Sequence, residues 1–336
     1  MFLPNPAFAS SWPQRRYSYA AVLALAGVGA AFPAAAGRLL SLPLAVGMVL
    51  LGVAHGACDQ LVVPATGRGS SGWRYWLGFL GGYLGLAGVV GVLWWRWPAP
   101  AVGIFLVLTV WHWGSADAPG PEPEPLGVWL MHSVLRGLLL FAVPAWCWPT
   151  ETAGVVNNLL TFTGAAPLGM ATFATGARVL AALTLGGHLG LWLWYARHRR
   201  GAGLPTEALE VLLLTGLFVA LPPRLSVGVY FVFWHSLQHV LRLTSWLGYP
   251  TPAASPGPAL LPRLVFFLRR AAPLLLISCV ALLALGYLAA AHRPDANTWF
   301  SLALVVASVV TLPHALLVTT VMDAARWRGA LGRSTS

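Results

Sequence analysis

Long apolar blocks dominate this sequence, and short polar connections separate them. The blocks run to about 17–25 residues, which is the length that a helix needs to cross the hydrocarbon core of a bilayer. Strands of an outer-membrane barrel would instead show short segments of alternating polarity. Only 9% of the residues are charged, whereas soluble domains carry about one quarter. The sequence therefore predicts an all-α, polytopic integral membrane bundle.

The blocks divide into about ten expected spans, with eight to ten as the range. These spans are Tyr17–Ala36, Leu39–Val62, Trp73–Trp95, Val102–Ala116, Leu126–Trp146, Thr172–Tyr195, Ala208–Leu221, Ser226–Leu247, Leu264–Ala290 and Thr298–Val321. Pro144, Pro273 and Pro313 lie inside spans, and kinks are expected there. The Gly-rich stretch GFLGGYLG in the third span has the small-residue spacing of closely packed helices. The Pro-rich stretches PGPEPEP and TPAASPGP are expected to be extended loops.

The arginines predict the topology. With ten spans, one face collects thirteen of them: Arg15, Arg16, Arg68, Arg74, Arg197, Arg199, Arg200, Arg263, Arg269, Arg270, Arg326, Arg328 and Arg333. The other face collects four: Arg38, Arg96, Arg224 and Arg293. By the positive-inside rule the first face is cytoplasmic, so an inner-membrane protein with both termini in the cytoplasm is expected. The net charge of +11 then reflects topology, and no nucleic-acid partner is expected. Arg15, Arg16, the apolar stretch and FPAAA also resemble a signal peptide, but retention of this helix is the favoured interpretation.

Histidines inside the spans indicate a site. His235 and His239 are four residues apart, which places them on one face of a helix. With the expected topology, the histidines of several spans fall in one layer, from the middle of the membrane to its cytoplasmic half. They are His55, His112, His132, His188, His235, His239 and His314. Ionisable groups within a membrane tend to mark functional sites, and imidazole is the commonest metal ligand, so the shared depth predicts a metal site.

Carboxylates near these histidines are candidate partners of the ligands. Asp59 follows His55 by four residues, Asp117 follows His112 by five, and Glu210 lies near the start of the seventh span. Such groups accept the second N–H of a metal-bound imidazole. Asp117 and Glu210 have a second interpretation, as residues at a solvated helix end.

The residues leave the metal open, because imidazole ligands suit iron, copper, zinc or nickel. A zinc protease is disfavoured because the HSLQH stretch lacks the glutamate of HExxH. A single HxxxH also argues against a membrane di-iron hydroxylase and for one metal ion. Haem with two histidine ligands stays open. The chain has no lysine, so it cannot hold retinal as a Schiff base in the manner of a rhodopsin.

Four motifs occur in a characteristic order: HGACD at His55, WHWGSAD at His112, PPRLSVGVYFVFWHSLQH ending at His239, and LPHALLVTTVMD at His314. From about Leu39 to Asp323 the chain resembles the Brp/Blh family of bacterial and archaeal membrane β-carotene 15,15′-dioxygenases. The resemblance implies a catalytic membrane region over 39–325, preceded by an extra helix in 1–38 and followed by a basic tail, 326–336. One departure is Cys58, where the family motif has leucine; a small apolar role is favoured over a thiolate ligand.

The resemblance further implies central cleavage of β-carotene by O2 at a non-haem Fe(II), giving two molecules of retinal. The family's four iron ligands correspond to His55, His112, His235 and His239, which leaves His314 in the pocket or beside a ligand. Candidate substrate contacts are Trp111, Trp113, Tyr230, Phe231 and Trp234. The lipid bilayer is the expected surrounding, and the retinal product is a candidate for transfer to a rhodopsin. Alternatives are a haem-binding or transport protein that uses the same histidines, a different carotenoid substrate, and an assembly partner of retinal proteins without catalysis of its own.

Overall fold

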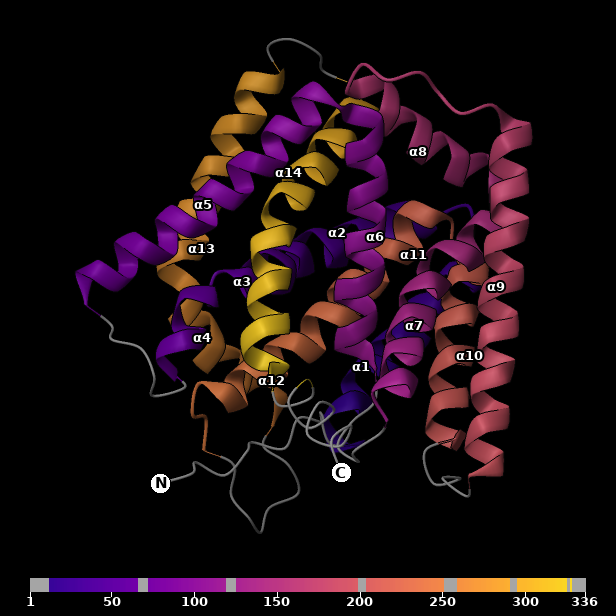
Figure 1. Ribbon diagram of the computed structural model, residues 1–336, viewed down its shortest axis with the longest axis horizontal. Coiled ribbons are helices and arrows are strands. Elements are labelled where there is room, and N and C mark those ends of the chain that lie inside the picture. The colour runs from indigo at the N-terminus through magenta and orange to yellow at the C-terminus, as the bar shows by residue number, and fades with distance from the viewer. Residues whose placement is uncertain are drawn as a thin grey trace.

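The structure, a computed structural model, describes residues 12–65, 72–118, 125–198, 204–250, 259–290, 295–324 and 327. Every regular element in these residues is helical, as expected for an all-α bundle (Figure 1). In the first half of the chain the elements are α1 (Trp12–Ala31), α2 (Ala36–Gly47), η1 (Met48–Val53), α3 (Ala54–Gly56), α4 (Asp59–Ala65), α5 (Trp73–Arg96), α6 (Pro98–Asp117), α7 (Leu126–Cys147) and α8 (Pro149–Phe162). The second half contains α9 (Met170–Arg197), α10 (Leu204–Ala220), α11 (Pro223–Val229), η2 (Tyr230–Ser236), α12 (Leu237–Trp246), α13 (Leu260–Ala290), α14 (Ala296–Leu317) and η3 (Val318–Met322).

Among the described residues, seven helical segments are long and apolar enough to cross a membrane. They are Ala36–Gly56, Trp73–Arg96, Pro98–Asp117, Leu126–Cys147, Met170–Arg197, Leu260–Leu288 and Asn297–Met322. The expected count of ten is therefore not confirmed. The other three expected spans are also helical, in α1, α10 and the run from α11 to α12. Of these, α10 has only 17 residues, which is at the short limit for a helix that crosses a bilayer.

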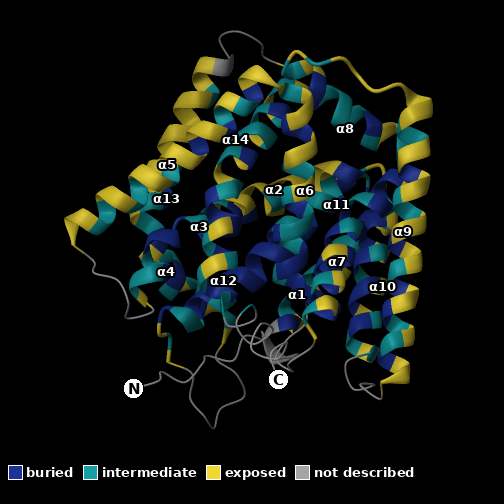
Figure 2. Cartoon of the chain, viewed as in Figure 1, coloured by how far each residue is buried: buried dark blue, intermediate teal, exposed yellow. Residues whose placement is uncertain are grey.

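The polarity of the bundle suits a lipid surrounding. Exposed residues cover much of α5, α9 and α13 at the periphery, whereas the central elements η2, α12 and α7 are mostly buried (Figure 2). In the most apolar windows of α5 and α13, only 11% of the residues are buried within the protein. Apolar side chains on such helices gain nothing from burial in protein when lipid covers them.

Three helical runs contain a π-helical segment, and each of these runs also carries a histidine of the predicted site. η1 ends two residues before His55, η2 contains His235, and η3 begins four residues after His314. Insertions of this kind are frequent at functional sites because they redirect side chains within an otherwise regular helix. The second expected span is also interrupted, since α3 ends at Gly56 and α4 begins at Asp59.

The closest helix approach involves glycines of α6 and α7. A Cβ atom on Gly114 would lie 1.8 Å from the backbone oxygen of Ser133, and one on Gly137 would lie 2.0 Å from the oxygen of Val110. The prediction of close packing at GFLGGYLG is wrong for this chain, because Cβ atoms on Gly78, Gly81, Gly82 and Gly85 would meet nothing within 4 Å. The glycine contact between α6 and α7 instead fixes the helix that carries His112.

The expected Pro-rich loops and the basic tail largely fall outside the residues that the structure describes, which omit 119–124, 251–258, 325–326 and 328–336.

Candidate metal centre

Five buried histidines from four parts of the chain meet inside the bundle: His55, His112, His235, His239 and His314. Neighbouring ring centroids lie 4.8 Å apart for His112 and His314, 4.9 Å for His55 and His314, and 5.2 Å for His112 and His235. His239 completes the group at 5.3 Å from His314 and 5.4 Å from His55. The expectation that histidines of the same depth converge is met by these five, which we call the histidine cluster.

The tightest part of the cluster includes His314. One ring nitrogen from each of His55, His112 and His314 lies within 4.8 Å of the others. Among the described residues, this is the group of histidine, cysteine and carboxylate side chains arranged closely enough to hold a metal ion. His314, which the sequence placed beside the ligands, thus lies as near to the centre as the expected ligands His55 and His112.

Hydrogen bonds orient two of the rings. Nδ1 of His55 lies 3.2 Å from the backbone oxygen of Leu51, and a carbonyl can only accept. His55 therefore donates from Nδ1, which leaves the lone pair of its Nε2 free. Nδ1 of His314 lies 2.8 Å from Oδ2 and 2.9 Å from Oδ1 of Asp59. A carboxylate that accepts from one nitrogen in this way directs the other nitrogen toward a metal.

Asp59 therefore pairs with a histidine of the cluster, but that histidine is His314 rather than His55, its neighbour in sequence. The turn at Ala57 and Cys58, between α3 and α4, separates Asp59 from the helical face of His55. A second bond anchors the carboxylate, because the hydroxyl of Tyr83 in α5 donates to Oδ2 over 3.2 Å. Tyr83, Asp59 and His314 thus join three helices next to the cluster.

Several ring nitrogens of the cluster are buried without a hydrogen-bond partner among the described residues. They are Nδ1 of His112, Nε2 of His314, and both nitrogens of His235 and His239. Leaving a buried polar atom unpaired costs about 1–3 kcal/mol. The presence of several such nitrogens in one cluster therefore requires a specific explanation. Each neutral imidazole offers one lone pair, so coordination of a cation would account for one of these nitrogens in each ring. The residues present therefore fit a metal ion.

Aromatic side chains cover one side of His235. Trp113 lies 5.4 Å from this imidazole and stacks on Phe231 at 5.2 Å, and Phe231 is itself 6.1 Å from His235. Tyr230 lies 6.5 Å from His235, and its hydroxyl donates to Oδ2 of Asp117 over 2.5 Å. Asp117 therefore links α6 to η2, and it accepts a hydrogen bond from this tyrosine rather than from a histidine of the cluster.

The other two expected substrate contacts face different neighbours. Trp234 stacks on Tyr19 of α1 with centroids 5.5 Å apart. Trp111 packs against Trp129 at 5.7 Å, and its Nε1 donates to Thr319 over 3.2 Å.

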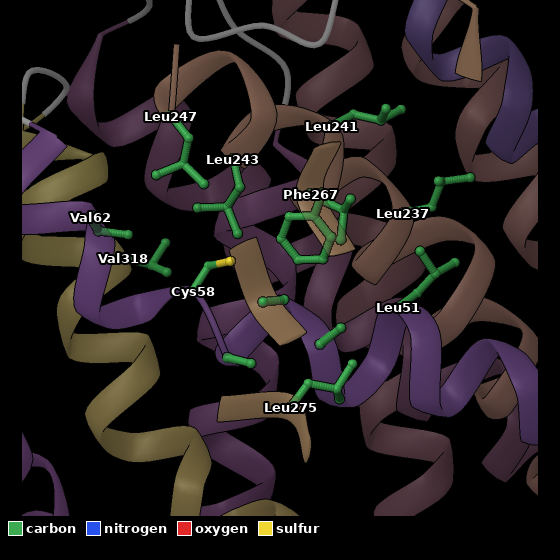
Figure 3. Packing of buried hydrophobic residues seen from close by; sticks show 14 of the residues in the cluster. Leu51, Cys58, Val62, Leu237, Leu241, Leu243, Leu247, Phe267, Leu275 and Val318 are labelled. Carbon is green, nitrogen blue, oxygen red and sulfur yellow. The ribbon is translucent and has the colours of Figure 1, made fainter. Parts of the chain in front are cut away.

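Cys58 occupies an apolar environment. Its side chain is fully buried in a cluster of hydrophobic residues that includes Leu243, Phe267 and Val318 (Figure 3). This packing agrees with the expected small apolar role.

Three of the expected partners lie outside the histidine cluster. The Nδ1 of His188 donates a hydrogen bond to the Thr184 carbonyl of its own helix over 2.9 Å. His132 and Glu210 belong to a buried ion network with Arg136 and Glu207, which the sequence analysis left unassigned. A signal for this network does exist in the sequence, because Arg136 follows His132 by four residues inside an apolar span, and Glu207 precedes Glu210 by three.

The fold and the site define a class: a helical protein with apolar spans of membrane length, built around a buried centre of five imidazoles. Residues 46–323 match the family described as beta-carotene 15,15'-dioxygenase, and the chain belongs to this family. It is thus a carotenoid 15,15′-dioxygenase, as the resemblance implied.

A curated relative supports the same conclusion. The probable beta-carotene 15,15'-dioxygenase Blh of Halobacterium salinarum is 32% identical over 333 aligned residues, which cover 94% of this chain and 92% of the relative. No solved structure matches the chain significantly.

Proposed function

We propose that the chain cleaves β-carotene at the central 15,15′ double bond with O2, at a non-haem Fe(II) held by the histidine cluster, giving two molecules of all-trans-retinal. The unpaired, buried imidazole nitrogens of the cluster are the main support for a metal centre. The reaction balances without a further reductant, because one carbon–carbon double bond breaks and the two oxygen atoms form two aldehyde groups. The substrate is the finer part of the proposal, since another carotenoid would obey the same balance.

The proposed ligands are His55, His112, His235 and His239, as the resemblance implies, together with His314. The bond from His314 to Asp59 supports this addition, because a carboxylate partner fixes the tautomer that leaves Nε2 available. When bound, a redox-active ion such as Fe(II) would activate O2. Zinc has no redox chemistry and would not supply this activation.

The remaining residues of the site would orient the substrate and exclude water. Trp113, Phe231 and Tyr230 lie against His235 and offer flat apolar surfaces to a polyene. Asp117 accepts from the Tyr230 hydroxyl, which fixes that ring. All five imidazoles are buried, so water is kept from the reacting atoms. The orientations of Trp234 toward Tyr19 and of Trp111 toward Trp129 favour packing roles for those two rings.

We place the protein in the inner membrane, with multiple spans and with both termini in the cytoplasm. The thirteen-to-four distribution of arginines supports this orientation. A C40 hydrocarbon dissolves in the bilayer, so a site between helices is reached without passage through water. Retinal released there is available to a rhodopsin in the same membrane.

Haem is less compatible with the cluster than a single ion. Five imidazoles with neighbouring centroids 4.8–5.4 Å apart leave little room for a flat macrocycle between any two of them. A Soret band in the purified protein would identify the haem alternative, and its absence together with bound iron agrees with the proposal.

Expression in a bacterium that accumulates β-carotene tests the function. Cells with the wild-type protein should lose orange colour and form retinal, whereas His235→Ala should abolish retinal because it removes a ligand. The control is His198→Ala, which changes an exposed histidine at the end of α9 and should leave retinal formation unchanged. Pigments are extracted and separated by chromatography at matched protein levels. Unchanged β-carotene with folded wild-type protein, or full activity in His235→Ala, would refute the proposal.

A further inference from the structure

A buried ion network lies beside the histidine cluster and involves α1, α7 and α10. Arg136 and Glu210 are 2% and 1% exposed, and Glu207 is 1% exposed. Nη2 of Arg136 donates to Oε2 of Glu207 over 2.5 Å and to Oε2 of Glu210 over 2.6 Å. His132 adds a contact of 2.6 Å to the same oxygen of Glu207. Arg136 thus holds both glutamates of α10 against α7.

The N-terminal helix α1 joins this network through one face. The other oxygen of Glu210, Oε1, accepts from Nη1 of Arg15 and from the hydroxyl of Tyr19, the latter over 2.5 Å. Arg15 and Tyr19 are four residues apart and therefore adjacent on the helix surface. Two donors on one carboxylate oxygen fix both the rotation and the depth of α1 relative to α10.

The charges of the network balance, because two arginines face two glutamates. Burial makes this balance important, since removal of one partner leaves an uncompensated charge in a medium of low dielectric constant. Loss of a donor to Glu210 would therefore weaken the attachment of α1 to α10.

Tyr19 also contacts the segment that carries His235. The ring of Tyr19 stacks on Trp234 with an interplanar angle of 28°. Trp234 is fully buried and directly precedes His235 in η2. Tyr19, Trp234 and Tyr230 belong to one hydrophobic cluster, to which Val22 of α1 and Leu217 of α10 also contribute. The side chain of Tyr19 thus touches the network with its oxygen and the π-helical segment with its ring.

We infer that α1, which lies outside the residues 46–323 matched by the family, is part of the catalytic unit. Tyr19, held by Glu210, is a positioning residue for the η2 segment that carries His235. The inference rests on the proposed function, because the effect is transmitted to a proposed ligand. It also assigns to α1 a role in the site, rather than that of an accessory segment preceding the catalytic region.

The test separates the ring of Tyr19 from its hydroxyl. Tyr19→Leu removes the stack on Trp234, and we expect kcat to fall roughly tenfold or more with little change in KM, because small misplacements of reacting groups are costly. Tyr19→Phe keeps the ring and should retain most of kcat. The control is Leu23→Ala, which changes an exposed side chain of the same helix and should behave as wild type. Each protein is purified, loaded with Fe(II), and assayed with β-carotene.

A spectroscopic measurement distinguishes positioning from general loss of structure. Nitric oxide is added to each iron-loaded protein, and the electron paramagnetic resonance spectrum of the adduct reports the ligand geometry. We expect a changed spectrum in Tyr19→Leu and the wild-type spectrum in Tyr19→Phe. If Tyr19→Leu does not yield monodisperse protein, Trp234→Leu replaces it, since it removes the other ring and leaves the donors of Glu210 in place. Wild-type kcat and spectrum in the leucine variant would overturn the inference. A wild-type protein that forms no retinal would instead refute the proposed function.

Discussion

Asp59 and His314 are 255 residues apart in sequence, but the Nδ1 of His314 donates a hydrogen bond to the Asp59 carboxylate inside the bundle. The HGACD motif identified Asp59 as a partner of a ligand, yet sequence spacing can only pair a residue with its own helix, and so suggested His55. The long-range contact with His314 depends on the packing of α4 against the helical run formed by α14 and η3, which one sequence does not contain. The same limit hid Arg136, whose counter-charges lie on α10.

Iron content tests the proposed role of His314. His314→Ala should lose most of the bound iron, and Asp59→Asn should bind it roughly 10–100-fold more weakly, since it weakens the group that orients the ligand. The measurement is metal per chain in proteins purified anaerobically and titrated with Fe(II). His188→Ala, a buried histidine bonded within its own helix, is the matched control and should keep wild-type iron. Full iron content in His314→Ala would remove this residue from the ligand set.

The helices show a different balance between what sequence predicts and what it leaves out. Seven of the expected spans meet the criteria of length and hydropathy, because an apolar block of the right length is itself the physical cause of insertion. The other three are also helical, and one of them, α10, has only 17 residues and is therefore short for a span. Residues of the histidine cluster and of the ion network, such as His55 and Arg136, lie in recognised spans as well, so hydropathy alone does not locate the site. The π-helical segments leave no such pattern in the sequence.

The contact between α6 and α7 gives a prediction at this scale. Gly114→Ala would place a Cβ atom 1.8 Å from the backbone oxygen of Ser133, and backbone cannot move aside as a flexible side chain can. We expect a loss of stability of about 2 kcal/mol or more, and a loss of bound iron because His112 is two residues away. Thermal unfolding in detergent measures the first effect.

Gly103→Ala is the matched control on the same helix. A Cβ atom there would meet nothing within 4 Å, and alanine favours a helix by about 1 kcal/mol over glycine. The melting temperature of this variant should therefore equal or exceed that of the wild type. An unchanged melting temperature in Gly114→Ala would show that the two helices separate more easily than the structure implies.

At the scale of the whole molecule, apolar side chains face outward and polar ones gather inside. Leu276, Ile277, Val280 and Leu283 of α13 are more than 60% exposed, whereas the histidine cluster and the ion network are buried. Composition predicted the outward face, since 58% hydrophobic residues cannot all be buried in a single soluble core. It could not predict that the polar residues around His314 and those around Arg136 form separate groups in the interior.

The most direct test of the central claim is product stoichiometry with purified protein. The wild-type enzyme, loaded with Fe(II) in detergent, is given β-carotene and O2, and the products are quantified by chromatography. Central cleavage at the histidine cluster predicts two molecules of retinal for each β-carotene consumed, with no product in His235→Ala. Unequal apocarotenals would place the cleavage elsewhere on the polyene, and retinal formation that survives His235→Ala would contradict a centre that requires this imidazole.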